Sequence, residues 1–419
     1  MRILRVLFML FLTASIFTGN PDHANAQAYD MLLKGGHVID PKNGIDSPMD
    51  IAIKNGIIVR VAQDISAENA GQVVDAGGLY VTPGLIDIHA HYYWGTEPNR
   101  YLSNSFASLP PDGFTFRSGV TTAVDVGGAG WRNFQHFKEQ VIDRSRTRVL
   151  SFINIVGDGM SGLPEQNIND MDPKMTALAA GRHDEIVGVK IAHFRGYNWE
   201  PHYRAAEAGV EAGIHVMIDL GLSDIPLPLD TLFFDIYRPG DILTHTYGSP
   251  VVGPGFKEAA VDEEGILRTH WMDAQQNGFI FDVGHGGGSF FYDIAIPATQ
   301  QGFWPNTIST DIHTGSMNAG MKDMLNVVSK FLNLGMPLQE AIEASTWKPA
   351  QVIQREDLGH LSEGAEADIA VFRHREGDFG FIDAAGGVES GDQKLETEVT
   401  IRAGRVVYDL NGIATRRWR

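Results

Sequence analysis

A pair of histidines separated by one residue is the strongest chemical signal in the sequence. His89 and His91 follow the apolar run 85–88, which comes after a Pro-Gly turn at residues 83–84. Because side chains alternate along a strand, the two imidazoles point to the same side. Two imidazoles at the end of one strand can bind one metal ion, so we predict a metal site here.

Asp311 and His245 are the next candidates for metal ligands. Asp311 ends the apolar run 307–310, and a carboxylate there can complete the site of the two histidines and act as the general base. The alternative for Asp311 is an N-cap of the following helix. We favour the ligand because His89 and His91 need an anionic partner. His245 also ends an apolar run and is a candidate ligand of a second metal.

Lys190 ends the apolar strand expected at residues 186–190. A buried amine is costly unless it is paired or neutral, and burial lowers its pKa. A neutral amine reacts with carbon dioxide, and the resulting carbamate is anionic and can bridge two metals. The residues alone leave two alternatives open, this carbamate and a lysine paired with a carboxylate.

His285 and His193 are candidates for contact with a substrate. His285 lies in the glycine-rich segment 282–289, whose glycines allow a close approach of the backbone to a ligand. We expect it to act as a metal ligand, a proton donor or a hydrogen-bond partner of the substrate. Either His285 or His193 can polarise a substrate carbonyl.

These side chains need a scaffold that brings them together. Apolar runs alternate with helical stretches along the middle of the chain, which predicts an α/β fold, a (β/α)8 TIM barrel, with a doubly wound parallel sheet as the alternative. In a barrel the active site lies at the C-terminal ends of the strands, where seven of these eight runs carry a ligand-type or acidic residue. The runs are 85–88, 121–126, 149–156, 186–191, 215–220, 241–246, 279–283 and 307–310, and the helical stretches include 131–144, 200–212, 228–237 and 290–302.

The two ends of the chain have a different sequence pattern from the middle. Short β-type patterns separated by turns occupy residues 29–82, and similar patterns return over 358–412. We therefore predict a small β-sandwich built from residues 27–82 and 358–419, beside a barrel that spans residues 83–357.

The first residues have the pattern of a secretory signal peptide. A basic segment at residues 1–5 precedes an apolar stretch over 6–17, and Ala24-Asn-Ala26 fits the small-x-small cleavage pattern. We expect cleavage after Ala26 and a periplasmic or secreted enzyme with no membrane association after cleavage. An uncleaved anchor is the alternative.

Composition excludes several classes of protein. The chain has 419 residues, 33 Lys+Arg against 52 Asp+Glu, a formal charge of −19 and no Cys. Such acidity argues against a nucleic-acid partner, because phosphate contacts need basic patches. The absence of Cys excludes disulfides, thiolate zinc sites and Cys nucleophiles. His, Asp, Glu and modified Lys therefore remain as metal ligands.

The sequence resembles the amidohydrolase superfamily of metal-dependent hydrolases over essentially its whole length after the leader. The segments that carry the resemblance are the first-strand motif 81–91, the second-strand motif 119–122 and the C-terminal signature 359–371. Within the superfamily, segments 282–290, 308–313 and 320–324 are similar to the deacetylase subgroup, which is often labelled dihydroorotase-like. Some of its members cleave the acetyl ester of (R)-mandelate.

The resemblance implies a ligand set for two divalent metals, zinc with manganese as the alternative. His89, His91 and Asp311 would hold the first metal, Lys190 as a carbamate would bridge, and His245 would hold the second. The superfamily usually supplies another His from the fifth strand, where this chain has Asp219. Asp219 or His285 would then be the sixth ligand, or the site would work with one tight metal.

We expect an enzyme that hydrolyses an acyl ester or amide bond of a small molecule by a metal-bound hydroxide. A cyclic amidase or a nucleobase deaminase is the alternative, and a non-catalytic binding protein is a further one. Tyr92 and Tyr93 stand where dihydroorotases carry Arg, which argues against that activity. Arg117 and Arg195 are candidate anion binders. The oligomeric state stays open, a homo-oligomer included.

Overall fold

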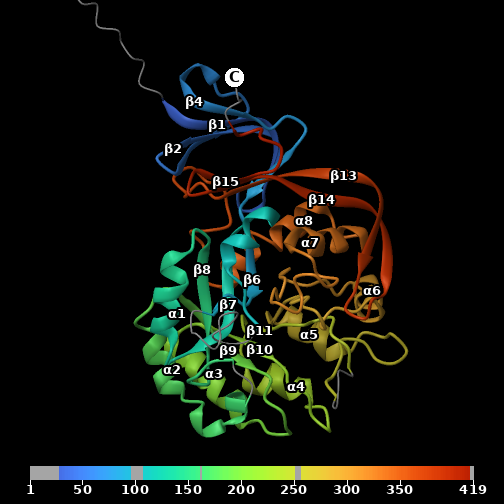
Figure 1. The fold of residues 1–419 in the computed structure, drawn as a ribbon. Helices are drawn as coiled ribbons and strands as arrows, with labels where there is room; N and C mark the ends of the chain where they lie inside the picture. Colours follow the sequence, from blue (N-terminus) through green and yellow to red (C-terminus); the bar gives the residue numbers. More distant parts are fainter. Residues whose placement is uncertain (1–27, 96–106, 161–162, 251–255, 416–419) are drawn as a thin grey trace, which may run out of the picture.

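The computed structural model describes residues 28–95, 107–160, 163–250 and 256–415 (Figure 1). The expected signal peptide over residues 1–26 lies outside these residues. Within them, no helix combines the length and the apolar character needed to cross a membrane. The chain forms an α/β unit around a parallel sheet and a second, separate sheet, which Figure 1 shows at the top of the view.

Seven parallel strands form the sheet of the α/β unit, and they lie side by side in the order in which the chain makes them. They coincide with the first seven predicted apolar runs. Strands buried on both faces are nearly continuous apolar runs, which is why the sequence indicates them so clearly. The strands are β6 (Leu85–Ala90), β7 (Val120–Gly130), β8 (Arg148–Asn154), β9 (Ile186–Ala192), β10 (His215–Asp219), β11 (Ile242–Leu243) and β12 (Ile280–Phe281).

The eighth predicted run, residues 307–310, is not a regular strand. This run and the two residues after it form the segment 307–312, which makes two isolated parallel bridges. Thr307 bridges to Asp282, and Ile312 bridges to Ala90. Asp282 follows β12 and Ala90 ends β6, so the segment 307–312 contacts both edges of the parallel sheet.

Helices cover the outer side of this sheet. The predicted helix at 200–212 is confirmed as α3, while the predicted helix at 228–237 is a short α4 followed by a π-helical turn at Leu232–Ile236. The helical stretches named from the sequence do not include α2, α5, α7, α8 or α9. The helices are α1 (Phe134–Gln140), α2 (Pro173–Ala180), α3 (Glu200–Ala212), α4 (Leu229–Thr231), α5 (Thr269–Gln276), α6 (Tyr292–Gln300), α7 (Met324–Asn333), α8 (Leu338–Glu343) and α9 (Trp347–Val352).

The second sheet joins both ends of the chain, as the sequence predicts. It is one hydrogen-bonded sheet of eight strands rather than the two separate sheets of a sandwich, because β5 pairs with β1 on one side and with β13 on the other. The strands are β1 (Tyr29–Asp40), β2 (Ile45–Lys54), β3 (Ile57–Ala62), β4 (Ala70–Asp75), β5 (Tyr80–Pro83), β13 (Ile369–Ile382), β14 (Val388–Arg402) and β15 (Arg405–Asp409).

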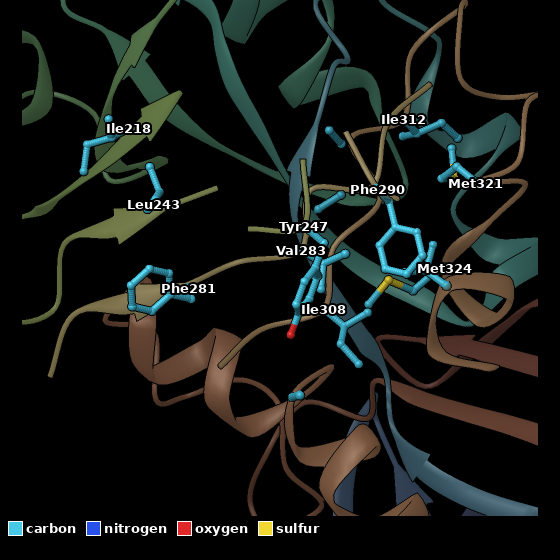
Figure 2. Packing of buried hydrophobic residues seen from close by; sticks show 14 of the residues in the cluster. Ile218, Leu243, Tyr247, Phe281, Val283, Phe290, Ile308, Ile312, Met321 and Met324 are labelled. Carbon is cyan, nitrogen blue, oxygen red and sulfur yellow. The ribbon is translucent and has the colours of Figure 1, made fainter. Parts of the chain in front are cut away.

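A hydrophobic core that includes several aromatic rings fills the space between the parallel sheet and its helices, and Figure 2 shows part of it. Phe281 is fully buried, with its ring centroid 5.3 Å from that of Trp271 and 5.0 Å from that of Phe303. Because Phe281 directly precedes Asp282 at the end of β12, this packing also fixes the strand end where polar residues begin.

Replacing Phe281 with Ala should therefore destabilise the protein. We expect a loss of about 3–5 kcal/mol of unfolding free energy, because the ring loses its transfer free energy and leaves a cavity. Urea denaturation followed by tryptophan fluorescence measures this. Val388→Ala on β14 is the matched control, since Val388 is 65% exposed. Equal midpoints for the two variants would contradict the prediction.

Candidate metal centre

The structure brings six of the predicted site residues to the same end of the parallel sheet. His89 and His91 come from β6 and the residue after it, Lys190 from β9 and Asp219 from the last position of β10. His245 follows β11, and Asp311 lies in the segment 307–312. Parallel strands end at the same edge of a sheet, so residues far apart in sequence meet there. None of the six side chains is more than 10% exposed.

The first cluster consists of His89, His91 and Asp311. Asp311 Oδ1 lies 3.0 Å from His91 Nε2 and 3.4 Å from His89 Nε2, and the three ligand atoms are all within 4.8 Å of one another. Burial raises the pKa of Asp311, but the two histidines outweigh it and hold that pKa below its ordinary value. The lowered pKa favours the ionised form of Asp311, which a metal ligand or a general base needs.

The second cluster shares His89 with the first and adds Asp219 and His245. His245 Nε2 lies 3.3 Å from Asp219 Oδ2. The other ring nitrogen, Nδ1, lies 2.7 Å from the carbonyl oxygen of Gly284. Nδ1 must carry a proton to donate this bond, which leaves Nε2 as the ring nitrogen on the side of Asp219.

Lys190 lies beneath the second cluster and is fully buried. Its Nζ is 3.2 Å from Asp219 Oδ2 and makes no hydrogen bond among the described residues. Burial raises the pKa of Asp219, but Lys190, His245 and His193 together hold it well below its ordinary value. Lys190 thus lies within ion-pair distance of a carboxylate, which is one of the two alternatives that the sequence leaves open.

His89 is oriented by a hydrogen-bond chain that sequence reasoning missed. Thr244 Oγ1 donates to Asp282 Oδ2 at 2.8 Å, so the same oxygen must accept from His89 Nδ1, 2.7 Å away. The Nε2 of His89 is then unprotonated and faces Asp311. Burial and the Lys190 ammonium lower the pKa of His89 to about 3, which favours the same neutral ring.

Asp282 is itself held by further hydroxyl groups. Thr307 Oγ1 donates to its Oδ1 and Ser309 Oγ donates to its Oδ2, both at 2.7 Å. The sequence carried a signal for this carboxylate, because Asp282 interrupts the apolar run 279–283. A partner carboxylate behind a ligand histidine fixes both the tautomer and the orientation of the ring.

Three of the site residues have strained backbones. His193, His245 and Asp311 have φ angles of 54°, 59° and 49°. These angles lie in the left-handed region, which residues other than Gly and Asn rarely adopt. Such strain persists where the surrounding structure over-determines a functional geometry. A Cβ on Gly286 would lie 2.3 Å from Asp311 Oδ2, so the glycine-rich segment makes room for the carboxylate.

His285 lies apart from the two clusters, contrary to the expectation that it contacts metal or substrate. Its Nδ1 lies 2.9 Å from the carbonyl oxygen of Gly286, and its Nε2 contacts Nζ of Lys330 on α7. Burial and the Lys330 ammonium lower the pKa of His285 to about 3. The side chain is fully buried, and neither of the cavities described below is lined by it.

Two adjoining cavities open onto the clusters. One of about 360 Å³ is lined by His91, Asp311 and His313, and another of about 210 Å³ is lined by Arg195 and Lys257. Both are also lined by His193, Asp219, His245, Gly288 and Ser289.

His193 is the predicted substrate contact that does line these cavities. Its Nε2 lies 3.4 Å from Asp219 Oδ2, and its Nδ1 lies 3.3 Å from Glu165 Oε1. Burial lowers the pKa of His193, but Asp219 and Glu165 outweigh this and raise it. The imidazole is therefore suited to donate hydrogen bonds.

The structure also places Arg117 and the tyrosines that follow His91. Arg117 lines a separate cavity with Lys322 and Lys394, away from the clusters. Tyr92 and Tyr93 are buried, and their backbone NH groups donate to Asp125 Oδ2 at 2.6 and 3.1 Å. These tyrosines therefore pack at the rim, and Asp125 organises the backbone there.

Comparison with known proteins agrees with this geometry. The amidohydrolase family profile matches residues 297–407. The chain is 30% identical to a deacetylase of Brucella anthropi over 367 residues, which cover 85% of this chain and 87% of that protein.

Two solved structures share the fold over nearly the whole chain. A crystal structure of an adenine deaminase matches with a TM-score of 0.80 and 25% identity, covering 91% of this chain and all of that one. A crystal structure of a dihydroorotase matches with a TM-score of 0.78 and 26% identity, covering 90% of this chain and 99% of that one. Together with the deacetylase, these similarities show that the chain belongs to the amidohydrolase superfamily, as a deacetylase-like hydrolase.

Proposed function

We propose that this protein is a metal-dependent hydrolase that cleaves an acyl ester or amide bond of a small molecule. The observation that carries the proposal is the pair of ligand clusters that share His89, each with its ligand atoms within 4.8 Å of one another. Because both clusters lie against His89, two cations held by them would be neighbours. The adjoining cavities have room for a small substrate.

The donor set fits divalent metals. Imidazole nitrogens and carboxylate oxygens bind zinc and manganese, and the buried His89 Nε2 has no hydrogen-bond partner among the described residues. His89, His91 and Asp311 would hold one metal, and Asp219 and His245 the other. Bound metals would supply Lewis acidity, which lowers the pKa of a water and polarises a carbonyl.

The chain's own residues would move the proton and orient the substrate. As the water oxygen bonds to the acyl carbon, Asp311 accepts the water proton. Asp311 then gives this proton to the leaving alkoxide or amine when the bond between acyl carbon and leaving group breaks. His193 donates a hydrogen bond to the acyl oxygen. No covalent acyl-enzyme is needed in this sequence of steps.

Lys190 would carry a carbamate in the metal-loaded enzyme. Its ammonium would first lose one proton to solvent, and the neutral amine nitrogen would then bond to the carbon of carbon dioxide and lose a second proton, which converts a cation into an anion. Two cations at the clusters would favour that anion. Without metal, the ammonium pairs with Asp219, whose Oδ2 lies 3.2 Å from Lys190 Nζ.

We also infer that residues 307–312 act as the eighth strand of a (β/α)8 barrel over residues 83–357. The bridges to Asp282 and Ala90 support this closure. Residues 27–82 and 358–419 form the accompanying β-unit. The leader pattern at residues 1–26 supports export to the periplasm or the medium.

Removing the metal should abolish activity. After treatment with a strong chelator, we expect no hydrolysis of acetylated hydroxy and amino acids, and recovery with zinc or manganese in bicarbonate buffer. Release of carboxylic acid without ammonia supports an acyl hydrolase, whereas release of ammonia from nucleobases would identify a deaminase. Full activity after chelation would contradict the metal-dependent mechanism, and purified protein without metal would favour a binding protein.

Replacing Asp311 with Asn should remove the base while keeping the shape of the side chain. We expect kcat to fall by about 100-fold or more, within the range for loss of a general base. Metal content is measured on the same sample, since Asp311 is also a proposed ligand. An unchanged kcat would contradict the assignment.

Replacing Thr244 with Val should weaken metal binding by about 10–100-fold, because the hydroxyl between Asp282 and His89 orients the ligand ring. Competition with a chromophoric chelator measures the zinc affinity. Thr246→Val is the matched control, since Thr246 Oγ1 donates to the backbone oxygen of Asp282 at 2.8 Å. Equal affinities for the two variants would contradict this role of Thr244.

A further inference from the structure

A third cavity lies away from the metal centre, where the parallel-sheet unit meets the second sheet. This junction cavity has a volume of about 440 Å³, and its walls come from the turn before β7, the start of α7, and strands β14 and β15. It shares no lining residue with the two cavities above the ligand clusters. Helix α7 packs against β14 (Figure 1). The volume is within the range of about 300–1,000 Å³ that is usual for small-molecule sites.

Each wall of the junction cavity contributes one cationic side chain. Arg117 comes from the turn before β7, Lys322 from the residues just before α7, and Lys394 from β14. Within the part of the chain that the structure describes, none of the three has a carboxylate within ion-pair distance. The chain carries 52 acidic residues against 33 basic ones, so cations without a close carboxylate are unexpected at one place.

The two carboxylates that also line the cavity are used elsewhere. Glu396 Oε2 lies 3.4 Å from Arg375 Nη1, which neutralises it. Asp323 Oδ1 accepts a hydrogen bond from Asn326 N at 2.8 Å and so caps α7. Burial raises the pKa of Asp323, whereas Lys394 and Arg117 act against this rise.

The charges in the cavity therefore do not cancel. Lys394 and Arg117 act on the same carboxylate, that of Asp323, and Lys322 precedes this residue in the chain. Like charges that gather around one cavity repel each other unless an anion lies between them. The cavity thus keeps an excess of positive charge in a protein whose overall charge of −19 repels anions.

The remaining lining offers a hydroxyl group and apolar surface. Thr397 is 4% exposed, and its buried Oγ1 has no hydrogen-bond partner among the residues described. Leaving a buried hydroxyl unpaired costs free energy, which a ligand oxygen would recover. Leu325, Leu395 and Leu410 form the apolar part of the lining. A suitable ligand therefore combines several anionic oxygens with a short apolar body.

We propose that the junction cavity binds a small organic dianion, a phosphate monoester or a dicarboxylate, at a site separate from the metal centre. Arg117, Lys322 and Lys394 would contact the anionic oxygens, and the three leucines would contact the apolar body. Because the cations come from both sheet units, a bound dianion would connect these units and stabilise the folded protein. This inference does not depend on the proposed hydrolase function.

The test measures the affinity of the purified protein for butyl phosphate and butylmalonate by titration calorimetry at mildly alkaline pH. Hexanoate has a similar apolar chain with a single negative charge, and we expect it to bind more weakly. Lys394→Met should weaken the binding of the dianions by about 10-fold or more, as for the loss of a hydrogen bond to a charged group. Lys394→Arg should retain most of the affinity. Lys257→Met is the matched control, because it removes the same charge from the smaller cavity at the metal centre.

Thermal denaturation gives a second readout. Saturating dianion should raise the Tm of the wild-type protein and raise that of Lys394→Met less. If Lys394→Met does not fold, Lys322→Met decides the question, since the Lys322 side chain is exposed.

Tighter binding of a dianion than of hexanoate, reduced in Lys394→Met or Lys322→Met, supports the site. The dianion with the higher affinity then identifies the source as a phosphate ester or a dicarboxylate. Unchanged affinity in both variants, equal affinity for hexanoate, or no measurable binding of either dianion overturns the inference. A loss of binding in Lys257→Met alone also overturns it, because the dianion would then occupy the cavity at the metal centre.

Discussion

Two buried carboxylates, Asp219 and Asp311, are the constraint on which the site depends. Burying an isolated carboxylate costs far more than a single contact returns, so each must lie next to cationic or hydrogen-bonding groups. Asp311 lies against His89 and His91, and Asp219 lies against Lys190, His193 and His245. These partners come from different strands. These groups therefore surround the two carboxylates only when the parallel sheet is in register, which couples the fold to its chemistry.

The backbone near the strand ends also helps to place the partner groups next to the two carboxylates. His193, His245 and Asp311 adopt left-handed conformations, and glycines 284 and 286 lie where a Cβ would collide with Thr244 or Asp311. The glycine-rich segment is thus shaped by its neighbours in the clusters. A strained backbone of this kind is kept because the hydrogen bonds around Asp282 and the aromatic packing below it leave little freedom.

The second sheet contributes to the site through Lys330. This buried lysine on α7 donates to the carbonyl oxygens of Gly320 and Ile382, at 3.0 and 2.6 Å, and contacts His285 Nε2. Ile382 is the last residue of β13, so one ammonium connects the second sheet, α7 and the glycine-rich segment. Burial lowers the pKa of Lys330 to about 7, and its donors are used in these contacts. His285 therefore supports the segment from behind rather than facing a ligand.

The sequence by itself determined the strands and the ligand-type residues. Strands buried on both faces need continuous apolar runs, and each run ends where the side chains become polar, so His89, Lys190, Asp219, His245 and Asp311 could be identified before their contacts were known. Only the tertiary structure decided which of these residues meet, that Thr244 and Asp282 orient His89, and that His193 lines the cavities while His285 faces Lys330. The physical reason is that side-chain direction at a strand end depends on local backbone angles and on contacts across the sheet. These backbone angles and contacts cannot be read from residue type and spacing alone.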